Sequence, residues 1–380
     1  MNKAVLPFLL IAALWAAENP GDAFAEKGLV GYRPWTNVRP WITATLKPED
    51  RGLLVSLDFF CPGAAEMKVV AGPSFAEIPW RPFEPSVRWA LPAGKTRIAI
   101  RAVFREKRPQ GDSARVTPPV SRLLDLADPD RILTGDGEGV WMDWTDGVLH
   151  AGATARKRDE ERHDAGESRK AATEAMRRGL GTAFLALAAE DGIDLSDLLG
   201  AVGRRAQVSL DVLERARIDE MDFPALDTVR VRGSVPLWGP AAESLREAAR
   251  LLQVQEPALD AVSARESTGL LVLDARGLHF TPCLFPQVWA ENETPCLVPG
   301  RRVSWQRPYV RYLRNPSQAS LARLGGLVGL KGAPVFLKAI GTRPQAPSTL
   351  LLTRRNQELL RAAGAGLARW MDGGWVVLVD

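Results

Sequence analysis

The sequence predicts a multidomain α+β protein, and two observations support this fold class. Between residues 33 and 127, short apolar runs alternate with Gly and Pro, which is typical of antiparallel strands joined by tight turns. From residue 148 onward, apolar residues recur at helical spacing between runs that alternate like strands. We therefore divide the chain into a signal peptide (1–25), a β-sandwich (33–127), an acidic and Gly-rich linker (128–147), a small β-α-α-β-β module (148–252) and a C-terminal α/β domain (266–380).

The N-terminus has the layout of a secretory signal peptide. Lys3 supplies a positive start, Ala4 to Ala17 is an apolar run, and Ala23-Phe24-Ala25 is a small-x-small cleavage site. The apolar run is shorter than the roughly 20 residues that a spanning helix needs. We therefore expect export, cleavage before Glu26, and a periplasmic mature chain without a transmembrane segment.

Composition indicates which partners are expected and whether the cysteines form a disulfide. The formal net charge of +4 is mild for 380 residues, and the basic residues are dispersed, so nucleic acid is not an expected partner. Three cysteines in an oxidising compartment favour a disulfide. Cys283 and Cys296 are close in sequence and are the candidate pair, which would stabilise the fold by about 3 kcal/mol. Cys61 lies in an apolar run and is expected to be a buried free thiol.

The β-rich third contains runs with one apolar face, such as Leu53–Phe59 and Arg97–Phe104. The stretch with Phe75, Trp80, Phe83 and Trp89, followed by the strand that ends at Phe104, resembles Ig-like modules of bacterial surface proteins. The resemblance implies an Ig-like β-sandwich. Two roles remain open for Trp80 and Trp89, which are either core anchors or a platform on which carbohydrate stacks.

The segment 128–147 is dense in carboxylates and glycine. Calcium, which takes six to eight oxygen ligands, is one interpretation of that density. The order of residues does not fit an EF-hand loop, however, and Trp141 and Trp144 interrupt it. We therefore predict a solvated, turn-rich linker.

Helical periodicity is strongest from Glu167 to Ala189, where Ala172, Met176, Leu180 and Phe184 recur at a spacing of four residues. A second helical stretch covers Ile193 to Val202, and Thr228 to Val235 alternates as a strand. Together these elements give the order β-α-α-β-β.

This region resembles the lipoprotein-20-type (FlgP-like) family of exported envelope and flagellar-assembly proteins. The resemblance lies in the helix that begins near Ala165-Gly166-Glu167 and in the run Val231 to Gly239, and it continues through Thr268–Leu278, Pro334–Gly341 and Trp375–Asp380. It implies a non-enzymatic envelope scaffold without a cofactor. Members of the family are anchored through an N-terminal lipidated cysteine, which this sequence lacks, so the resemblance leaves attachment to the outer membrane open.

The sequence contains no motif for catalysis or for a metal site. Its three histidines are not paired at metal-ligand spacing, and no nucleophile elbow or phosphate-binding loop is present. Asp274 and Arg276 are two residues apart at a strand end, where the ordinary interpretation is an ion pair that holds a turn.

The candidate binding segment is basic and aromatic and has no acid between residues 301 and 323. Arginine binds phosphate and carboxylate through two parallel hydrogen bonds, and aromatic rings stack on sugars. The alternative is a solvated loop whose arginines pair with acids of the preceding module. The candidate residues are Arg301, Arg302, Trp305, Arg307, Tyr309, Arg311, Tyr312 and Arg314.

We therefore expect a periplasmic, non-enzymatic scaffold or assembly factor, whose partners are envelope or flagellar proteins. The alternative is a binding module for a cell-wall or surface glycan, or for an anionic lipid headgroup.

Overall fold

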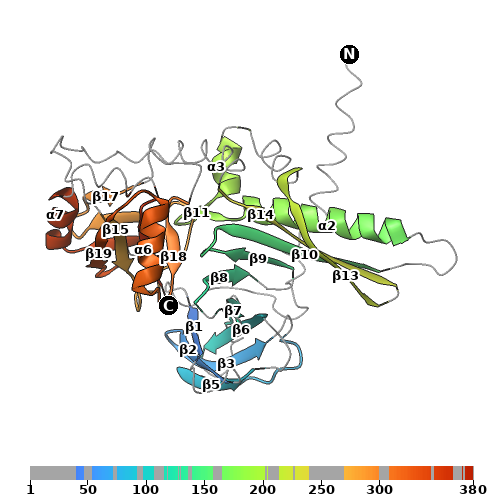
Figure 1. Cartoon of the computed structure of the whole chain (residues 1–380). Helices are drawn as coiled ribbons and strands as arrows, with labels where there is room; N and C mark the ends of the chain where they lie inside the picture. The colour runs from blue at the N-terminus through green and yellow to red at the C-terminus, as the bar shows by residue number, and fades with distance from the viewer. Residues whose placement is uncertain are drawn as a thin grey trace, which may run out of the picture. The chain divides into compact units, whose positions relative to one another are not determined.

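A computed structural model describes residues 40–46, 54–71, 75–91, 97–106, 115–117, 119–126, 128, 130–135, 139–156, 165–201, 203, 214–225, 227–238, 269–298, 308–343, 346–362, 370 and 373–379. This part of the chain is α+β and mostly strand, with several sheets and four helices (Figure 1). The chain divides into two compact units, one formed by residues 1–47, 54–91 and 100–121, and the other by residues 48–53, 92–99 and 122–380. The predicted signal peptide lies outside the described residues.

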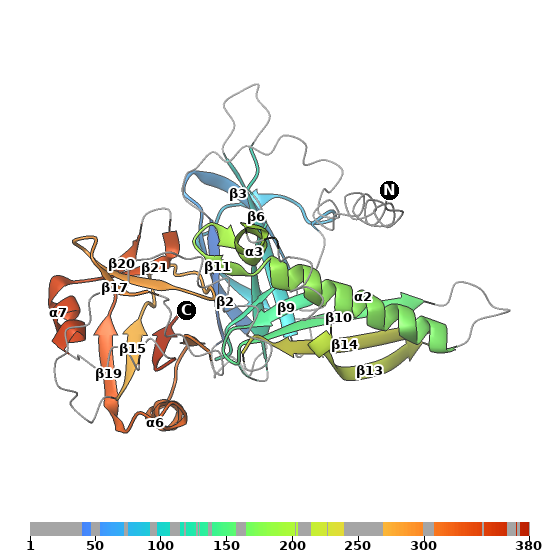
Figure 2. The same ribbon diagram turned by 90° about the horizontal axis from the view of Figure 1, so that it is seen from above.

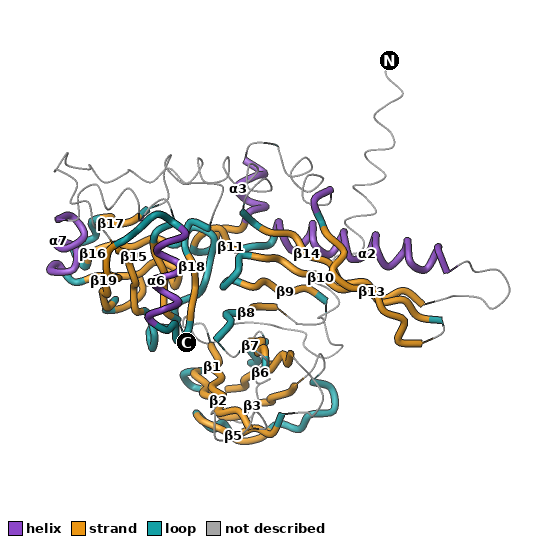
Figure 3. Tube along the Cα trace, in the orientation of Figure 1, coloured by secondary structure: helices purple, strands orange, loops and turns teal. Residues whose placement is uncertain are grey.

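The first unit contains strands and loops in its described part (Figure 3). Its strands form two antiparallel arrays. The first array has the order β1 (Trp41–Leu46), β2 (Leu54–Phe60), β5 (Ser86–Ala90). The second array has the order β6 (Arg97–Glu106), β3 (Ala64–Ala71), β4 (Arg81–Pro82). In β2, Val55, Leu57 and Phe59 alternate with more exposed residues, as the sequence predicted. The ring of Phe59 in the first array meets the ring of Phe104 in the second edge-on, with centroids 6.0 Å apart, so the two arrays contact each other through these buried rings.

Trp80 and Trp89 are half-buried, so neither is a fully buried core anchor. Cations lie over their rings instead. The guanidinium of Arg105 is 4.4 Å from the Trp80 ring centroid, the ammonium of Lys68 is 5.2 Å from it, and Arg81 lies over Trp89. Each tryptophan thus takes part in a cation–π contact at the surface of the first unit.

The second unit begins with a sheet that one long helix covers. The strand order is β13 (Arg217–Ala225), β14 (Thr228–Pro236), β10 (Val148–Arg156), β9 (Val140–Asp143), β8 (Leu133–Gly135) and β7 (Val120–Asp125). Helix α2 (Ala165–Leu185) runs across β10 and β14 (Figure 2). Its predicted apolar stripe is confirmed, because Met176 and Phe184 are buried. At Gly233 a Cβ atom would lie 2.7 Å from the sulfur of Met176, so glycine allows the helix to approach β14 closely.

The predicted linker at 128–147 is wrong where the structure describes it. The segment contains β8 and β9, and Trp141, Asp143 and Trp144 are buried. The two tryptophans are packing residues of this unit, and Arg131 contacts three of the carboxylates, those of Asp128, Asp143 and Asp146. Acid density is therefore not a reliable sign of a linker when a partner cation lies within the same segment.

Two short elements follow α2. A hairpin of β11 (Ala188–Glu190) and β12 (Ile193–Asp194) leads into α3 (Leu195–Ala201), which agrees with the predicted second helix. With β10, β13 and β14, the predicted order of elements is present, and the small hairpin is an addition to it.

The C-terminal part contains two four-stranded sheets. The parallel sheet has the order β18 (Arg311–Leu313), β22 (Trp375–Leu378), β15 (Gly269–Asp274), β19 (Gly332–Lys338). The mixed sheet has the order β17 (Pro295–Leu297), β16 (Gln287–Ala290), β21 (Ala346–Leu352), β20 (Gly341–Arg343). Helix α6 (Gln318–Leu327) packs on β15 and β19, and α7 (Arg354–Ala362) packs on β17 and β21. The strand β18 forms one edge of the parallel sheet, and this edge positions the candidate site.

Candidate functional site

A cleft of about 620 Å³ in the second unit brings together side chains from two distant parts of the sequence. One wall comes from residues 128–146, around β8 and β9. The other wall comes from β18, the loop after it, and α6. Carboxylates dominate the first wall and guanidinium groups the second, so the cleft is a candidate binding site for a charged ligand.

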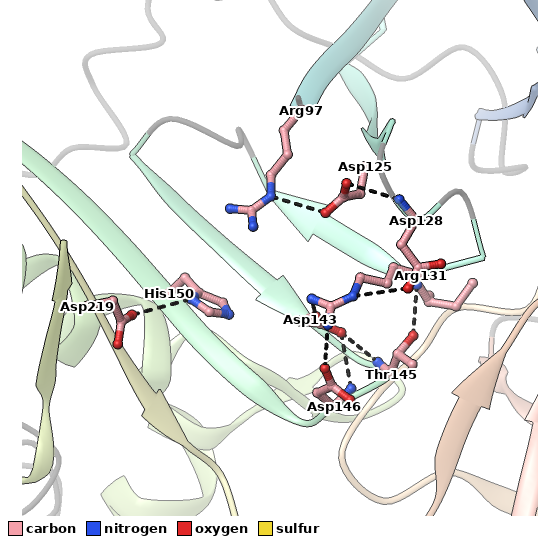
Figure 4. Close-up of polar contacts among 10 residues, drawn as sticks. Arg97, Asp125, Asp128, Arg131, Asp143, Thr145, Asp146, His150 and Asp219 are labelled. Carbon is pink, nitrogen blue, oxygen red and sulfur yellow. Dashed lines mark hydrogen bonds and ion pairs between the residues drawn. The ribbon is translucent and has the colours of Figure 1, made fainter. Parts of the chain in front are cut away.

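Arg131 organises the first wall (Figure 4). Its Nη1 atom is 2.7 Å from Oδ2 of Asp143, and its Nη2 atom is 2.8 Å from Oδ2 of Asp146. Its Nε atom is 3.4 Å from Oδ2 of Asp128. Burial lowers the pKa of Arg131, but these carboxylates raise it by more, so the net direction is upward. The guanidinium is therefore charged, and its hydrogen bonds are taken up within the protein.

The turn between β9 and β10 holds Asp143 in place. Asp143 is 1% exposed, and its Oδ1 atom accepts hydrogen bonds from the backbone N–H groups of Thr145 (3.0 Å) and Asp146 (3.1 Å). Gly147 closes the turn with a φ of +68°, a conformation that glycine adopts without strain. Burial raises the pKa of Asp143, against the lowering effects of these backbone hydrogen bonds and Arg131. Asp143 is thus a structural carboxylate.

The second wall carries Arg311, Arg314 and Arg323. Successive residues of a strand point to opposite faces, so Arg311 and Leu313 of β18 line the cleft while Tyr312 is buried behind them. Burial lowers the pKa of Arg311, and the charge of Asp146 raises it in part. In the described part of the chain, no hydrogen bond or ion pair joins the guanidinium groups of Arg311 or Arg323 to another residue.

The N-terminus of α6 adds to the positive character of this wall. The Ser317 side chain caps the helix by accepting a hydrogen bond from the Ser320 backbone N–H at 3.1 Å, and both serines line the cleft. Helix N-termini favour negative charge because their first N–H groups have no partner within the helix. The favourable ligand at this end of the cleft is therefore an anion.

Asn315 connects the two walls. Its Nδ2 atom donates to Oδ1 of Asp130 at 3.4 Å, and its Oδ1 atom accepts from Nη1 of Arg276 at 3.4 Å. Arg276 in turn pairs with Asp274 through contacts of 2.9 and 2.8 Å, so the ion pair predicted at this turn is confirmed. Asp130 is exposed, and no cationic side chain of the described residues pairs with it.

The predicted binding segment is divided by the structure. Arg311 and Arg314 line the cleft. Tyr309 and Tyr312 are 0% and 1% exposed, so their expected role as surface stacking residues is wrong. They were grouped with the arginines because they are close in sequence, but they point into the core. The predicted residues Arg301, Arg302, Trp305 and Arg307 lie outside the described residues.

The two buried tyrosines differ in their hydrogen bonds. The hydroxyl group of Tyr312 donates to the carbonyl oxygen of Cys283 at 2.7 Å and accepts from its N–H group at 3.2 Å. The hydroxyl group of Tyr309 has no hydrogen-bond partner among the described residues. Burial raises the pKa of both tyrosines. Tyr312 therefore fixes the segment before β16, whereas Tyr309 contributes mainly its ring.

The predicted disulfide is not present, since Cys283 and Cys296 are both free and buried, as Cys61 is. Each thiol of the predicted pair has its own surroundings. The Cys283 thiol lies against Ser348, and the Cys296 thiol donates to the carbonyl oxygen of Thr294 at 3.6 Å. Burial raises the pKa of Cys283 to about 12 and that of Cys296 to about 11. These cysteines behave as packing residues.

A second group of carboxylates lies in the β11–β12 hairpin. Oδ1 of Asp191 accepts from the backbone N–H of Ser348 at 2.6 Å, and Oδ2 accepts from the hydroxyl of Thr349 at 2.8 Å. The neighbouring Glu190 is half-buried, and among the described residues its carboxylate makes no hydrogen bond or ion pair. Burial, and secondarily Asp191, raises the pKa of Glu190 to about 7. Asp191 therefore fastens the hairpin to β21.

Sequence reasoning missed Arg131 and Asn315, and it placed Arg323 and Asp130 in two segments that it did not bring together. A signal for Arg131 was present, because it is a single cation within an acidic segment. The alternative of a solvated loop expected the arginines after residue 300 to pair with acids of the β-α-α-β-β module (148–252), whereas Asp146, the carboxylate whose charge acts on Arg311, lies before that module. The contact between Asn315 and Asp130 carried no such signal, because it joins residues 185 positions apart.

The described residues contain no group of three or more His, Cys, Asp or Glu residues that could hold a metal ion. None of their helices is both long enough and apolar enough to cross a bilayer. In comparisons with known proteins, the chain matches no protein-family model and no curated protein.

Proposed function

We propose that this chain is an exported, non-enzymatic protein of the bacterial envelope, which acts as a scaffold or accessory factor and holds an anionic component in the cleft. The observation that carries the proposal is the second wall. Arg311 and Arg323 line the cleft there without a hydrogen bond or ion pair to other described residues. Guanidinium groups recognise phosphate and carboxylate through paired hydrogen bonds, and a partly buried one gains most from an anionic ligand.

The chemistry of the cleft supports recognition rather than catalysis. Arginine remains protonated in proteins, so the second wall supplies hydrogen-bond donors and not a general base. On the first wall, Asp143 and Asp146 are already engaged by Arg131. The site therefore resembles a place where a charged group is held in position.

The proposed envelope role also rests on the fold. We propose that the first unit is an Ig-like module and that residues 148–252 and 266–380 form domains of the lipoprotein-20 kind. Two antiparallel arrays that pack through Phe59 and Phe104 support the Ig-like assignment. The order β10, α2, α3, β13 and β14 supports the second assignment. Folds of this kind do not determine function, so a flagellar role depends on the resemblance alone.

The second candidate is a binding module for a surface glycan or an anionic lipid headgroup. The arginines of the cleft favour a phosphate-bearing headgroup within that alternative. A neutral sugar is less favoured, because Tyr309 and Tyr312 are buried and Trp80 is covered by cations.

The proposal is tested by in-cell crosslinking of the tagged chain, followed by mass spectrometry of the captured components. A cleft variant, Arg311→Gln with Arg323→Gln, is compared with a control, Arg177→Gln with Arg178→Gln, which changes two exposed arginines of α2. We expect the unaltered chain and the control to capture the same envelope components and the cleft variant to lose them. Equal capture by all three proteins would exclude the cleft as the site of binding.

The flagellar part has a separate test. A deletion strain with impaired motility and altered flagellar ultrastructure would support that role. Normal flagella would remove it and leave an envelope scaffold that serves another assembly.

A further inference from the structure

We propose that the ligand of the cleft is a phosphate group that carries a primary ammonium a few bonds away, as in phosphoethanolamine, with the phosphate held by the second wall and the ammonium by Asp130. The inference rests on the proposed binding function and specifies the chemistry of its ligand. Its basis is the separation of opposite charges within one cleft, where several of the charges have not paired with one another.

The second wall fits a phosphate better than it fits a carboxylate. Arg311 and Arg323, which make no hydrogen bond or ion pair with other described residues, place two positive charges on one side of the cleft, next to the capped N-terminus of α6. A carboxylate supplies only one negative charge. A phosphate monoester supplies roughly 1.5 to 2 negative charges at neutral pH and three acceptor oxygens. Phosphate therefore satisfies more of the donors that line this wall.

The first wall makes a purely anionic ligand unfavourable. Asp128, Asp130 and Asp146 also line the cleft, and Arg131 is the one cation of that wall. Arg131 contacts Asp128 and Asp146, whereas Asp130 has only the amide of Asn315 at 3.4 Å among the described residues. A polyanion would meet repulsion from Asp130. A ligand with an ammonium group would neutralise that carboxylate.

The spacing favours a short ligand. Asn315 follows Arg314 directly in the chain, and its side-chain amide reaches the carboxylate of Asp130. The carboxylate is thus one hydrogen bond away from the residue beside the arginine wall. Because Asp130 and the arginines line the same cleft, a short link between phosphate and ammonium suits it better than a long chain does.

Isothermal titration calorimetry of the full chain tests this inference by comparing the affinities for inorganic phosphate, O-phosphoethanolamine and ethanolamine, in a buffer without phosphate. An exposed ion pair contributes up to about fivefold in affinity. We therefore expect phosphoethanolamine to bind about fivefold tighter than phosphate, and ethanolamine alone not to bind measurably. Asp130→Asn keeps the size of the side chain and an acceptor for Asn315, so it should equalise the two affinities without loss of phosphate binding.

Matched variants separate the two walls. Arg311→Gln and Arg323→Gln should each weaken both phosphate and phosphoethanolamine, and Arg323 is exposed, so its replacement tests the wall even if Arg311→Gln does not fold. Glu174→Gln, an exposed carboxylate of α2, is the control for Asp130→Asn and should leave both affinities unchanged.

The outcomes distinguish this inference from the proposed function. Equal affinities for phosphate and phosphoethanolamine in the unaltered chain, or an unchanged ratio in Asp130→Asn, would overturn the inference while anion binding stands. Binding of neither phosphate compound would overturn both.

Co-sedimentation with lipid vesicles shows whether the phosphoethanolamine group belongs to a lipid. Co-sedimentation with phosphatidylcholine vesicles that contain phosphatidylethanolamine, lost in Asp130→Asn and absent without that lipid, would identify a lipid headgroup, and it would show that the single negative charge of a phosphate diester is enough. Binding of O-phosphoethanolamine in solution without co-sedimentation would identify a soluble phosphate monoester.

Discussion

Arg131 and Arg311 lie on opposite walls of the same cleft, yet their surroundings differ. Arg131 has carboxylate oxygens at 2.7, 2.8 and 3.4 Å, whereas Arg311 has no hydrogen bond or ion pair to another described residue. A cation with its donors taken up stabilises the fold, and one with free donors is available to a ligand. The same contrast separates Tyr312 from Tyr309 and Asp191 from Glu190.

The largest expected effect is that of Arg131→Met. The substitution leaves Asp143, which is 1% exposed, without its charge partner. Loss of one partner of a buried pair costs several kcal/mol, and because Arg131 retains 31% exposure we expect a loss of about 2 kcal/mol in the free energy of unfolding. Denaturant unfolding at pH 7 measures it.

Arg311→Met is the matched comparison. Because it removes a desolvated cation without breaking a hydrogen bond to described residues, the free energy of unfolding should change by less than about 0.5 kcal/mol. Anion binding should be lost instead. Equal destabilisation by the two substitutions would show that Arg311 is structural, and the contrast between the walls would fail.

The next largest change in the free energy of unfolding is expected for substitution of Tyr312. Tyr312→Phe removes the hydroxyl group that bonds both backbone groups of Cys283, so we expect a loss of about 1 to 2 kcal/mol in the free energy of unfolding. Tyr309→Phe removes a hydroxyl group without a partner among the described residues and should cost less than about 0.5 kcal/mol. Thermal unfolding compares the two substitutions, which are identical in chemistry and similar in burial. A larger loss for Tyr309→Phe would reveal a partner for its hydroxyl group.

Local periodicity was the part of the fold that the sequence predicted well. The helix with Met176 and Phe184 on one face is present, because apolar residues at a spacing of four form a single helix face that must be buried. The alternating run that contains Val55 and Leu57 forms β2 for the corresponding reason. These features depend on neighbours within the same segment.

The candidate site could be predicted only in part, because its geometry depends on contacts between distant segments. Arg311 was predicted from its local composition, but its partner wall at Asp130 was assigned to a linker. Tyr312 was misassigned because composition does not tell which face of a strand points inward. The two cysteines near residue 290 were paired by proximity in sequence, whereas the structure places each thiol in a separate packed environment.

The carboxylates of the β11–β12 hairpin extend the comparison to pH. The pKa of Glu190 is raised by burial from 4.5 to about 7, so the folded state holds its proton where the unfolded chain has lost it. The contribution of Glu190 to stability is therefore fully present below about pH 4.5 and is lost as pH rises through about 7. Glu190→Gln mimics the protonated form, and we expect it to match the unaltered chain at pH 4.5 and to be more stable at pH 8.

Asp191→Asn is the control for that measurement. Asp191 accepts two hydrogen bonds from β21, and an amide oxygen can replace only one of its carboxylate oxygens. Denaturant midpoints should therefore be lower than those of the unaltered chain at both pH values. A stability difference between Glu190→Gln and the unaltered chain that does not change with pH would contradict the assignment of Glu190 as the titrating group.

The smallest effect is expected for Arg276→Ala. This substitution tests whether an ion pair stabilises the fold when both of its side chains are partly exposed to water. Arg276 holds Asp274 through two contacts below 3 Å, but the side chains are 42% and 28% exposed. The hydrogen bond from Arg276 lowers the pKa of Asp274, so this contribution is present above the unfolded pKa of about 3.9 and is lost as pH falls through the folded value. We expect Arg276→Ala to cost at most about 1 kcal/mol at pH 7 in low salt and less in 1 M salt, because solvent and salt screen exposed pairs. A loss as large as that of Arg131→Met would mean that the number of partners, and not the burial of the carboxylate, determines which cations stabilise this fold.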